Sequence, residues 1–163
     1  MTDTPVRGVQ PPPHPGLQAL EPLVGDWDVE PIVAGRSIGI GRARFEWIES
    51  GAFLVQRSDA EIPADAPPEW QANSPLPTTC VFGLDDSLGV FTMLYADSRS
   101  VSRVYQTTLA DDGRWTIWRD APGFFQRFTG TFSADGGIID GAWEFSADGK
   151  LWRVDFQLVY RRR

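Results

Sequence analysis

Arginine and tyrosine side chains recur within short, aromatic-rich segments of the chain, and such groups could bind an anion or a carbonyl. Arg103 alternates with Tyr105 in one segment, and Trp115, Ile117 and Arg119 alternate in another. In an extended strand this spacing places the side chains on one face. If those faces turn inward, guanidinium groups would meet among aromatic walls, where each needs an acid or an anionic ligand as partner. The ligand-binding residues that we expect are therefore Arg57, Tyr95, Asp97, Arg103, Tyr105, Trp118, Arg119 and Arg127.

An outward orientation is the alternative for each of these arginines. Arginine is mostly exposed in proteins, and its aliphatic stem covers neighbouring rings while the charged end stays in water. Surface acids such as Asp97 and Asp120 would then pair with the guanidinium groups. For any single arginine the outward orientation is the more frequent one, but several arginines near aromatic residues favour at least one that points inward.

The side chains of common catalytic sites are scarce. The only histidine is His14, and the sequence has no Ser–His pairing, no metal-spaced His/Cys cluster and no Gly-rich phosphate loop. Catalysis would have to use Tyr95, Asp97, Tyr105 or Asp120 for proton transfer, with an arginine holding an oxyanion. We therefore assign no catalytic residue, no metal site and no cofactor.

The segments that carry these residues are typical of antiparallel strands. Four runs rich in aromatic and β-branched residues follow one another between residues 90 and 132, separated by Gly, Asp, Ser or Pro. No helical pattern lies between the strands, and closure of the last strand onto the first would remove both sheet edges. The sequence therefore predicts an all-β fold, a single antiparallel up-and-down barrel of about ten strands, with a two-sheet sandwich as the alternative. The other predicted strands cover residues 25–30, 37–48, 52–62, 78–84, 138–145 and 151–160.

Two segments stand apart from the strands. Residues 1–15 are rich in proline and predict an extended arm, followed by the barrel domain over 16–163. Leu17, Leu20 and Val24 have helical spacing in a segment too short to be stable alone, so we expect a short helical cap. The Pro-rich segment 63–77 contains Trp70 and could be a lid over a cavity or an anchor on the barrel exterior.

Composition limits the partners and the compartment. The net charge of −7 and the pI near 4.6 argue against nucleic-acid binding. The single cysteine, Cys80, cannot form an internal disulfide and is expected as a buried apolar residue in a reducing, cytoplasmic environment. No signal peptide or membrane-spanning run is apparent, and the arginines at 161–163 suggest a frayed, solvated tail. We expect a small-molecule ligand, no nucleic acid and no membrane, and leave a homodimer open.

The order of these features resembles the calycin superfamily, which includes lipocalins and fatty-acid-binding proteins. A short apolar segment precedes Gly25-x-Trp27, which opens the first strand, and an arginine-bearing strand comes last. In lipocalins and their relatives this Trp closes one barrel end against a basic residue of the final strand, which implies Arg153 or Arg161 here. The chain after Pro15 is most similar to small bacterial domains of unknown function related to nitrobindin. Nitrobindin-type proteins hold haem through a late histidine that this chain lacks, so we expect no haem.

We expect the barrel to bind a small, partly apolar molecule whose carbonyl or carboxylate is held by Arg103, Arg119 or Arg127. One alternative is a cofactor-free isomerase or cyclase that uses the same cavity. Another is a structural or protein-interaction domain whose barrel is filled by its own aromatic residues. A cavity of roughly 300 Å³ or more would favour ligand binding or catalysis over the filled barrel.

Overall fold

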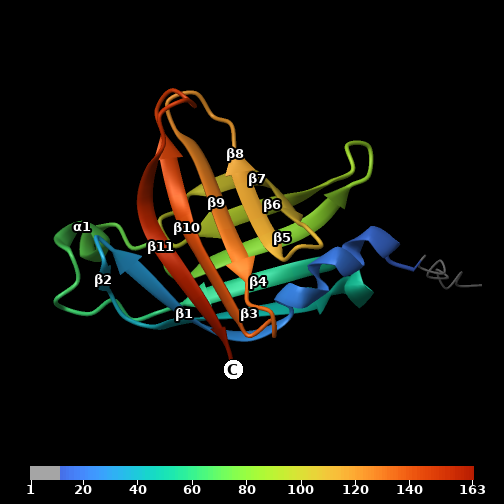
Figure 1. Ribbon diagram of the computed structural model, residues 1–163, viewed down its shortest axis with the longest axis horizontal. Coiled ribbons are helices and arrows are strands. Elements are labelled where there is room, and N and C mark those ends of the chain that lie inside the picture. The colour runs from blue at the N-terminus through green and yellow to red at the C-terminus, as the bar shows by residue number, and fades with distance from the viewer. Residues whose placement is uncertain (1–11) are drawn as a thin grey trace, which may run out of the picture.

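Each predicted aromatic-rich segment forms a strand in the computed structural model, which describes residues 12–163 (Figure 1). Short turns separate the strands, and Gly136 and Gly149 occupy the positive-φ positions that the Asp-Gly turns require. The 3-10 helices are η1 (Pro15–Leu23) and η2 (Glu49–Gly51), and the α-helix is α1 (Pro68–Ala72). The strands are β1 (Gly25–Val33), β2 (Arg36–Ser37), β3 (Gly41–Ile48), β4 (Phe53–Asp59), β5 (Thr78–Asp85), β6 (Val90–Asp97), β7 (Ser102–Leu109), β8 (Arg114–Arg119), β9 (Phe125–Phe132), β10 (Ile138–Ser146) and β11 (Arg153–Arg162).

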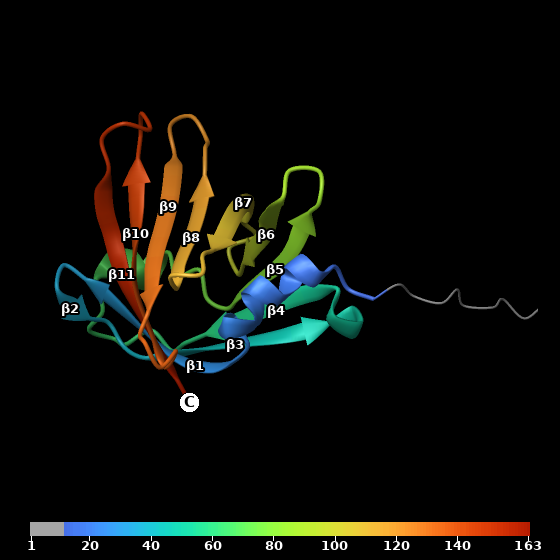
Figure 2. The same cartoon turned by 45° about the vertical axis from the view of Figure 1, so that its right-hand side comes forward.

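The sheet closes on itself. From β3 to β11 each strand pairs with its neighbour in sequence, and β11 returns to pair antiparallel with β1. The two-residue β2 only extends β1, so ten of the eleven strands form the ring. Figure 2 shows β8 to β11 standing side by side while β1, β3 and β4 run across below them. The predicted up-and-down barrel is confirmed, and the sandwich alternative is wrong.

One end of the barrel is covered by η1, as the leucine spacing predicted. Leu17, Leu20 and Leu23 of this segment are buried. The Trp27 side chain is fully buried beneath them, and its Nε1 donates a hydrogen bond to the Leu23 carbonyl oxygen at 2.8 Å. Trp115 lies in the same aromatic core. The apolar cap therefore closes this end by packing onto an aromatic core.

Arg162, rather than Arg153 or Arg161, is the basic partner of Trp27. The β1–β11 register places Trp27 opposite Arg162, whose guanidinium lies 4.2 Å from the centre of the indole ring. The same guanidinium donates hydrogen bonds of 2.6 Å to the carbonyl oxygens of Pro22 and Val24, at the end of η1. Arg162 therefore joins the last strand to the cap.

The expectation of a frayed tail at residues 161–163 is wrong, although these arginines are exposed to solvent. Arg161 lies 3.7 Å from the carboxylate of Glu30, and Arg163 lies 3.5 Å from that of Asp28. The backbone N–H of Arg163 also donates to the carbonyl oxygen of Asp26 at 3.0 Å. The terminal arginines are ordered because they complete the strand that closes the ring.

The alternation of inner and outer side chains along β11 breaks at a β-bulge. The β10–β11 register shifts between Trp143 and Glu144, which face Phe156 and Val154, so Asp155 has no cross-strand partner. Val154 is 60% exposed instead of sharing the inner face. The bulge changes the direction of the side chains at this end of β11.

The Pro-rich arm predicted for residues 1–15 lies mostly outside the described residues. From residue 12 onward, exposed prolines lead into η1. The Nδ1 of His14 accepts a hydrogen bond from the Gly16 N–H at 3.1 Å. None of the helices described is long and apolar enough to cross a bilayer.

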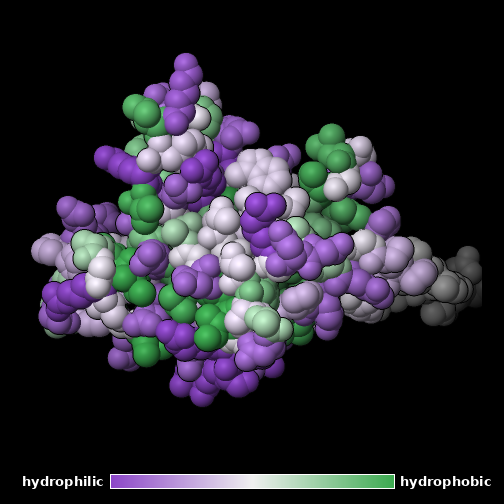
Figure 3. All heavy atoms as spheres, viewed as in Figure 1, coloured by the Kyte–Doolittle hydropathy of each residue, from purple (hydrophilic) through white to green (hydrophobic). Residues whose placement is uncertain are grey.

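Polar side chains cover much of the face of the molecule shown in Figure 3. Apolar residues stand out at the tips of the β5–β6 and β10–β11 hairpins (Figure 3), where Leu88 and Leu151 are 64% and 80% exposed. Isolated leucines of this kind are ordinary on protein surfaces. The face in Figure 3 therefore gives no reason to place a binding site at these tips.

Because Arg162 holds two carbonyl oxygens at the end of η1, Arg162→Met should lower the free energy of unfolding by about 2 kcal/mol. The neighbouring Arg161→Met removes one long surface ion pair and should cost less than about 1 kcal/mol. Urea denaturation of both variants measures the difference. Equal losses would contradict the role given to Arg162.

Candidate functional site

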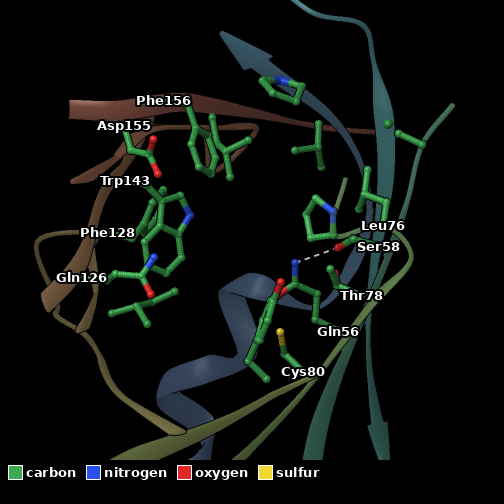
Figure 4. Close-up of a pocket in the computed structure, with 18 of the residues that line it drawn as sticks. Gln56, Ser58, Leu76, Thr78, Cys80, Gln126, Phe128, Trp143, Asp155 and Phe156 are labelled. Carbon is green, nitrogen blue, oxygen red and sulfur yellow. Dashed lines mark hydrogen bonds between the residues drawn. The ribbon is translucent and has the colours of Figure 1, made fainter. Parts of the chain in front are cut away.

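A cavity of about 420 Å³ occupies the part of the barrel that the aromatic core leaves unfilled. It opens toward α1, which contributes Trp70, and none of its lining residues comes from η1. Most of the wall is apolar, and hydrogen-bonding groups face each other across the space (Figure 4). The apolar lining includes Met93, Ile117, Phe128, Trp143, Phe156 and Leu158.

Gln126 organises the polar wall formed by β7 and β9. Its Oε1 accepts hydrogen bonds from the Tyr105 hydroxyl at 2.7 Å and from Nη1 of Arg103 at 3.3 Å. Because Oε1 takes both donors, Nε2 is the end of the amide that can donate to a ligand. Arg103 makes no ion pair within residues 12–163, and its guanidinium lies 4.9 Å from the ring of Phe124. This wall presents donors and one positive charge.

The facing wall, on β4 and β5, carries a second buried amide. Gln56 is 8% exposed and donates from Nε2 to the Ser58 hydroxyl at 2.9 Å. Burial raises the pKa of the Cys80 thiol to about 12, so this thiol stays protonated at neutral pH. Burial also raises the pKa of Tyr160, and its hydrogen bond with Gln56 opposes that shift. The side chains of Gln56, Ser58 and Cys80 on this wall are neutral and polar, and Asp59 at the end of β4 adds a carboxylate to the lining.

Tyr95 and Asp97 form a structural unit with Arg99. The Tyr95 hydroxyl donates to Oδ2 of Asp97 at 2.8 Å, and Nη2 of Arg99 donates to the same oxygen at 2.6 Å. Desolvation raises the pKa of the Asp97 carboxyl, but the hydrogen bonds from Arg99 and Tyr95 outweigh it and hold the pKa at about 2. The Tyr95 ring lines the cavity, whereas the Asp97 carboxylate is fully covered and already bonded.

Arg57 and Arg127 lie on the outer face of the barrel. Arg57 pairs with Glu46 on the neighbouring strand, and Nε of Arg127 pairs with the Glu144 carboxylate at 2.5 Å. The arginine that follows an inward glutamine must point outward, because successive side chains of a strand face opposite sides. These two positions therefore follow the surface alternative and do not line the cavity.

The two remaining predicted residues lie at the end of β8. Trp118 is opposite Arg127 in the β8–β9 register and shares its outward face. Arg119 is two residues after Ile117 and therefore on the same, inner side of β8, but it is not among the residues that line the cavity. Its charge still lowers the pKa of Tyr105, although burial is the larger effect and raises that pKa. Of the eight predicted residues, Tyr95, Arg103 and Tyr105 line the cavity together.

Sequence reasoning missed Gln56, Gln126 and Asp155. The alternation Gln126-x-Phe128-x-Gly130 was the available signal, because the buried Phe128 marks the inner face of β9. Gln126 shares that parity, whereas Arg127 does not. No comparable sequence pattern predicts that Asp155 lines the cavity, because its orientation depends on the β-bulge.

Trp70 takes the position of a lid. It lies on α1, half-buried, with its ring edge-on to Phe156 at a centroid distance of 5.0 Å. It contacts the mouth of the cavity rather than the distant outer wall. Of the two alternatives for segment 63–77, the contact with the cavity lining fits the lid.

The described residues offer hydrogen bonding rather than metal ligation. Within residues 12–163 no three His, Cys, Asp or Glu side chains gather as a metal site. His14, the only histidine of the sequence, is exposed outside the cavity, and the lining thiol of Cys80 is held protonated. The cavity walls combine apolar surface with hydrogen-bonding groups.

Comparisons with known proteins support the fold. Searches of protein-family models and of curated proteins returned no match to this sequence. Among solved structures, the barrel is similar to Rv2717c from M. tuberculosis, with a TM-score of 0.58 and 18% sequence identity. The likeness covers 93% of this chain and 99% of that protein. At this identity it establishes a shared barrel and nothing about activity.

All three tyrosines of the sequence have a raised pKa, chiefly because each is buried. The tyrosinate absorbance near 295 nm, which free tyrosine develops around pH 10, should therefore appear only at higher pH in the folded protein. The phenols hold their protons more tightly when folded, so their stabilisation is intact below about pH 10 and declines above it. A pH titration with and without urea measures this. Normal titration of the folded protein would contradict the buried positions.

Proposed function

We propose that the barrel binds a small, partly apolar molecule non-covalently in the cavity between the aromatic core and α1. The cavity of about 420 Å³ is the observation that carries this proposal. It falls in the range of known small-molecule sites, roughly 300–1,000 Å³. Apolar side chains supply most of the wall, and a few fixed polar groups could orient the ligand.

Arg103 and Gln126 indicate the polar group of the ligand. The Tyr105 hydroxyl and Arg103 both donate to Oε1 of Gln126, which leaves Nε2 and the rest of the guanidinium as donors. A half-buried guanidinium without a carboxylate partner favours an anion or a strong acceptor. A ligand carbonyl or carboxylate at this wall would meet that need.

The alternatives have less support. A structural or interaction domain whose barrel is filled by its own aromatic residues would not leave a cavity of this volume. For an isomerase or cyclase, Asp97 was one of four candidate proton carriers, and Arg99 and Tyr95 already hold its carboxylate. The stacking of Arg162 on Trp27 beneath an apolar cap supports a calycin-like barrel, and binding within the barrel is consistent with that resemblance.

The fluorescent anion 1-anilinonaphthalene-8-sulfonate combines apolar rings with an acceptor group and should bind the cavity. Arg103→Met should weaken its binding about tenfold, because one charge-assisted hydrogen bond contributes roughly 1.5 kcal/mol. Fluorescence titration measures the affinity. Near-ultraviolet circular dichroism checks that the variant keeps its tertiary packing.

Arg57→Met is the matched control, because Arg57 lies on the outer wall and pairs only with Glu46 within the described part of the chain. It should leave the affinity for the dye unchanged. If Arg57→Met weakened binding and Arg103→Met did not, the dye would be on the outer surface and the cavity proposal would fail.

A further inference from the structure

The β-bulge in β11 turns Asp155 toward the cavity. Asp155 has no partner in the β10–β11 register, since Trp143 lies opposite Phe156 and Glu144 lies opposite Val154. A bulge of this kind redirects the side chain of the extra residue. Figure 4 shows the Asp155 carboxylate beside Trp143 at the cavity wall, which it lines together with Phe156.

The Asp155 carboxylate has no partner of its own. Within residues 12–163 it accepts no hydrogen bond and forms no ion pair. Arg153 is the charge that acts on it, but the guanidinium of Arg153 lies over the ring of Phe145, 5.0 Å from its centre. Partial desolvation raises the pKa of Asp155, and the charge of Arg153 opposes that shift. The carboxylate is thus left to attract a positive group.

Five other charged side chains line the cavity, and within residues 12–163 none of them forms an ion pair with Asp155: Arg42, Asp59, Glu69, Arg99 and Arg103. Arg99 is paired with Asp97, and Arg103 is bonded to Gln126 on the wall of β7 and β9. Glu69, on α1, and Asp59, on β4, add further negative charges to the lining, and Arg42, on β3, adds a positive one. Asp155 is therefore the carboxylate on the wall of β11, while Arg103 is the positive charge on the wall of β7 and β9.

Trp143 lies between these two polar ends. Gln126, Trp143 and Asp155 belong to the successive strands β9, β10 and β11, and Figure 4 shows the indole between the amide and the carboxylate. Two inter-strand spacings separate the outer two residues, roughly 10 Å. The wall thus has donors at one end, an aromatic surface in the middle and an acceptor at the other end.

We propose that Asp155 is a cation-binding subsite and that the cavity takes an amino-substituted organic acid or amide. The flat body of the ligand lies against Trp143, its carbonyl or carboxylate reaches Gln126 and Arg103, and its ammonium pairs with Asp155. This inference rests on the proposed binding function for the acceptor end of the ligand. The amine end is carried by the bulge and the unpaired carboxylate.

Three benzene derivatives of similar size test the subsite. 4-(Aminomethyl)benzoate carries an ammonium and a carboxylate at opposite ends of the ring, 4-methylbenzoate lacks the ammonium, and 4-methylbenzylamine lacks the carboxylate. Calorimetry should give 4-(aminomethyl)benzoate an affinity about tenfold or more above that of 4-methylbenzoate, as expected for a partly desolvated ion pair. Asp155→Asn should abolish this advantage and leave the affinity for 4-methylbenzoate unchanged.

Glu69→Gln is the matched control, because it removes another carboxylate that lines the cavity. It should preserve the advantage of the amino compound. If Glu69→Gln abolished the advantage and Asp155→Asn did not, Asp155 would not be the subsite. Equal affinities of the native protein for the amino compound and 4-methylbenzoate would overturn the proposal as well.

A second measurement needs no variant. The carboxyl carbon of Asp155, followed by NMR, should titrate at lower pH when 4-(aminomethyl)benzoate is bound, because a nearby cation favours the ionised carboxylate. No change in that titration at saturation would overturn the subsite. If the naphthalene dye binds and none of the three compounds does, only this inference fails. If the dye does not bind either, the proposed function fails with it.

Discussion

Closure of β11 onto β1 is the constraint on which the rest of the structure depends. The register that places Trp27 opposite Arg162 fixes the position of the last strand in the ring. Arg162 strengthens this closure because it joins the indole of Trp27 to the carbonyl oxygens at the end of η1. In a closed barrel a shift of one residue would turn every inner side chain of that strand outward. The cavity lining therefore depends on a contact at the opposite end of the molecule.

The size of the inner side chains decides which part of the barrel interior is filled and which part remains a cavity. At the η1 end, Trp27 and Trp115 fill the space and are almost fully buried. Further along, Phe128 lies so close to Gly130 and Gly141 that a Cβ at either position would fall within 3 Å of its ring. These glycines let the Phe128 ring lie flat against the wall, and the space beyond it stays open. The cavity thus lies beyond the aromatic residues that fill the η1 end, in the part of the barrel that their side chains do not reach.

Much of the fold follows from local patterns, because strand periodicity and turn residues act over short distances. The strands, the buried leucines of η1 and the position of Trp27 were predicted for this reason. The direction of a polar residue within a strand is harder to predict. Gln126 and Arg127 are neighbours, and only the register of the closed ring decides which of them enters the barrel. Asp155 could not be anticipated at all, since a bulge follows from the competition between two strands and has no signature in one of them.

The unpaired charges of the cavity have an energetic consequence. Arg103 and Asp155 both line the cavity without a counter-ion of their own; Arg103 is half-buried, whereas Asp155 is partly exposed and keeps part of its hydration. They cannot compensate each other directly, because Trp143 and the width of two strands separate Asp155 from the wall that holds Arg103. A ligand that spans the Trp143 indole would pair with both charged side chains, Arg103 and Asp155, at once. Since such a ligand binds the folded state alone, its binding free energy would add to the stability of the barrel.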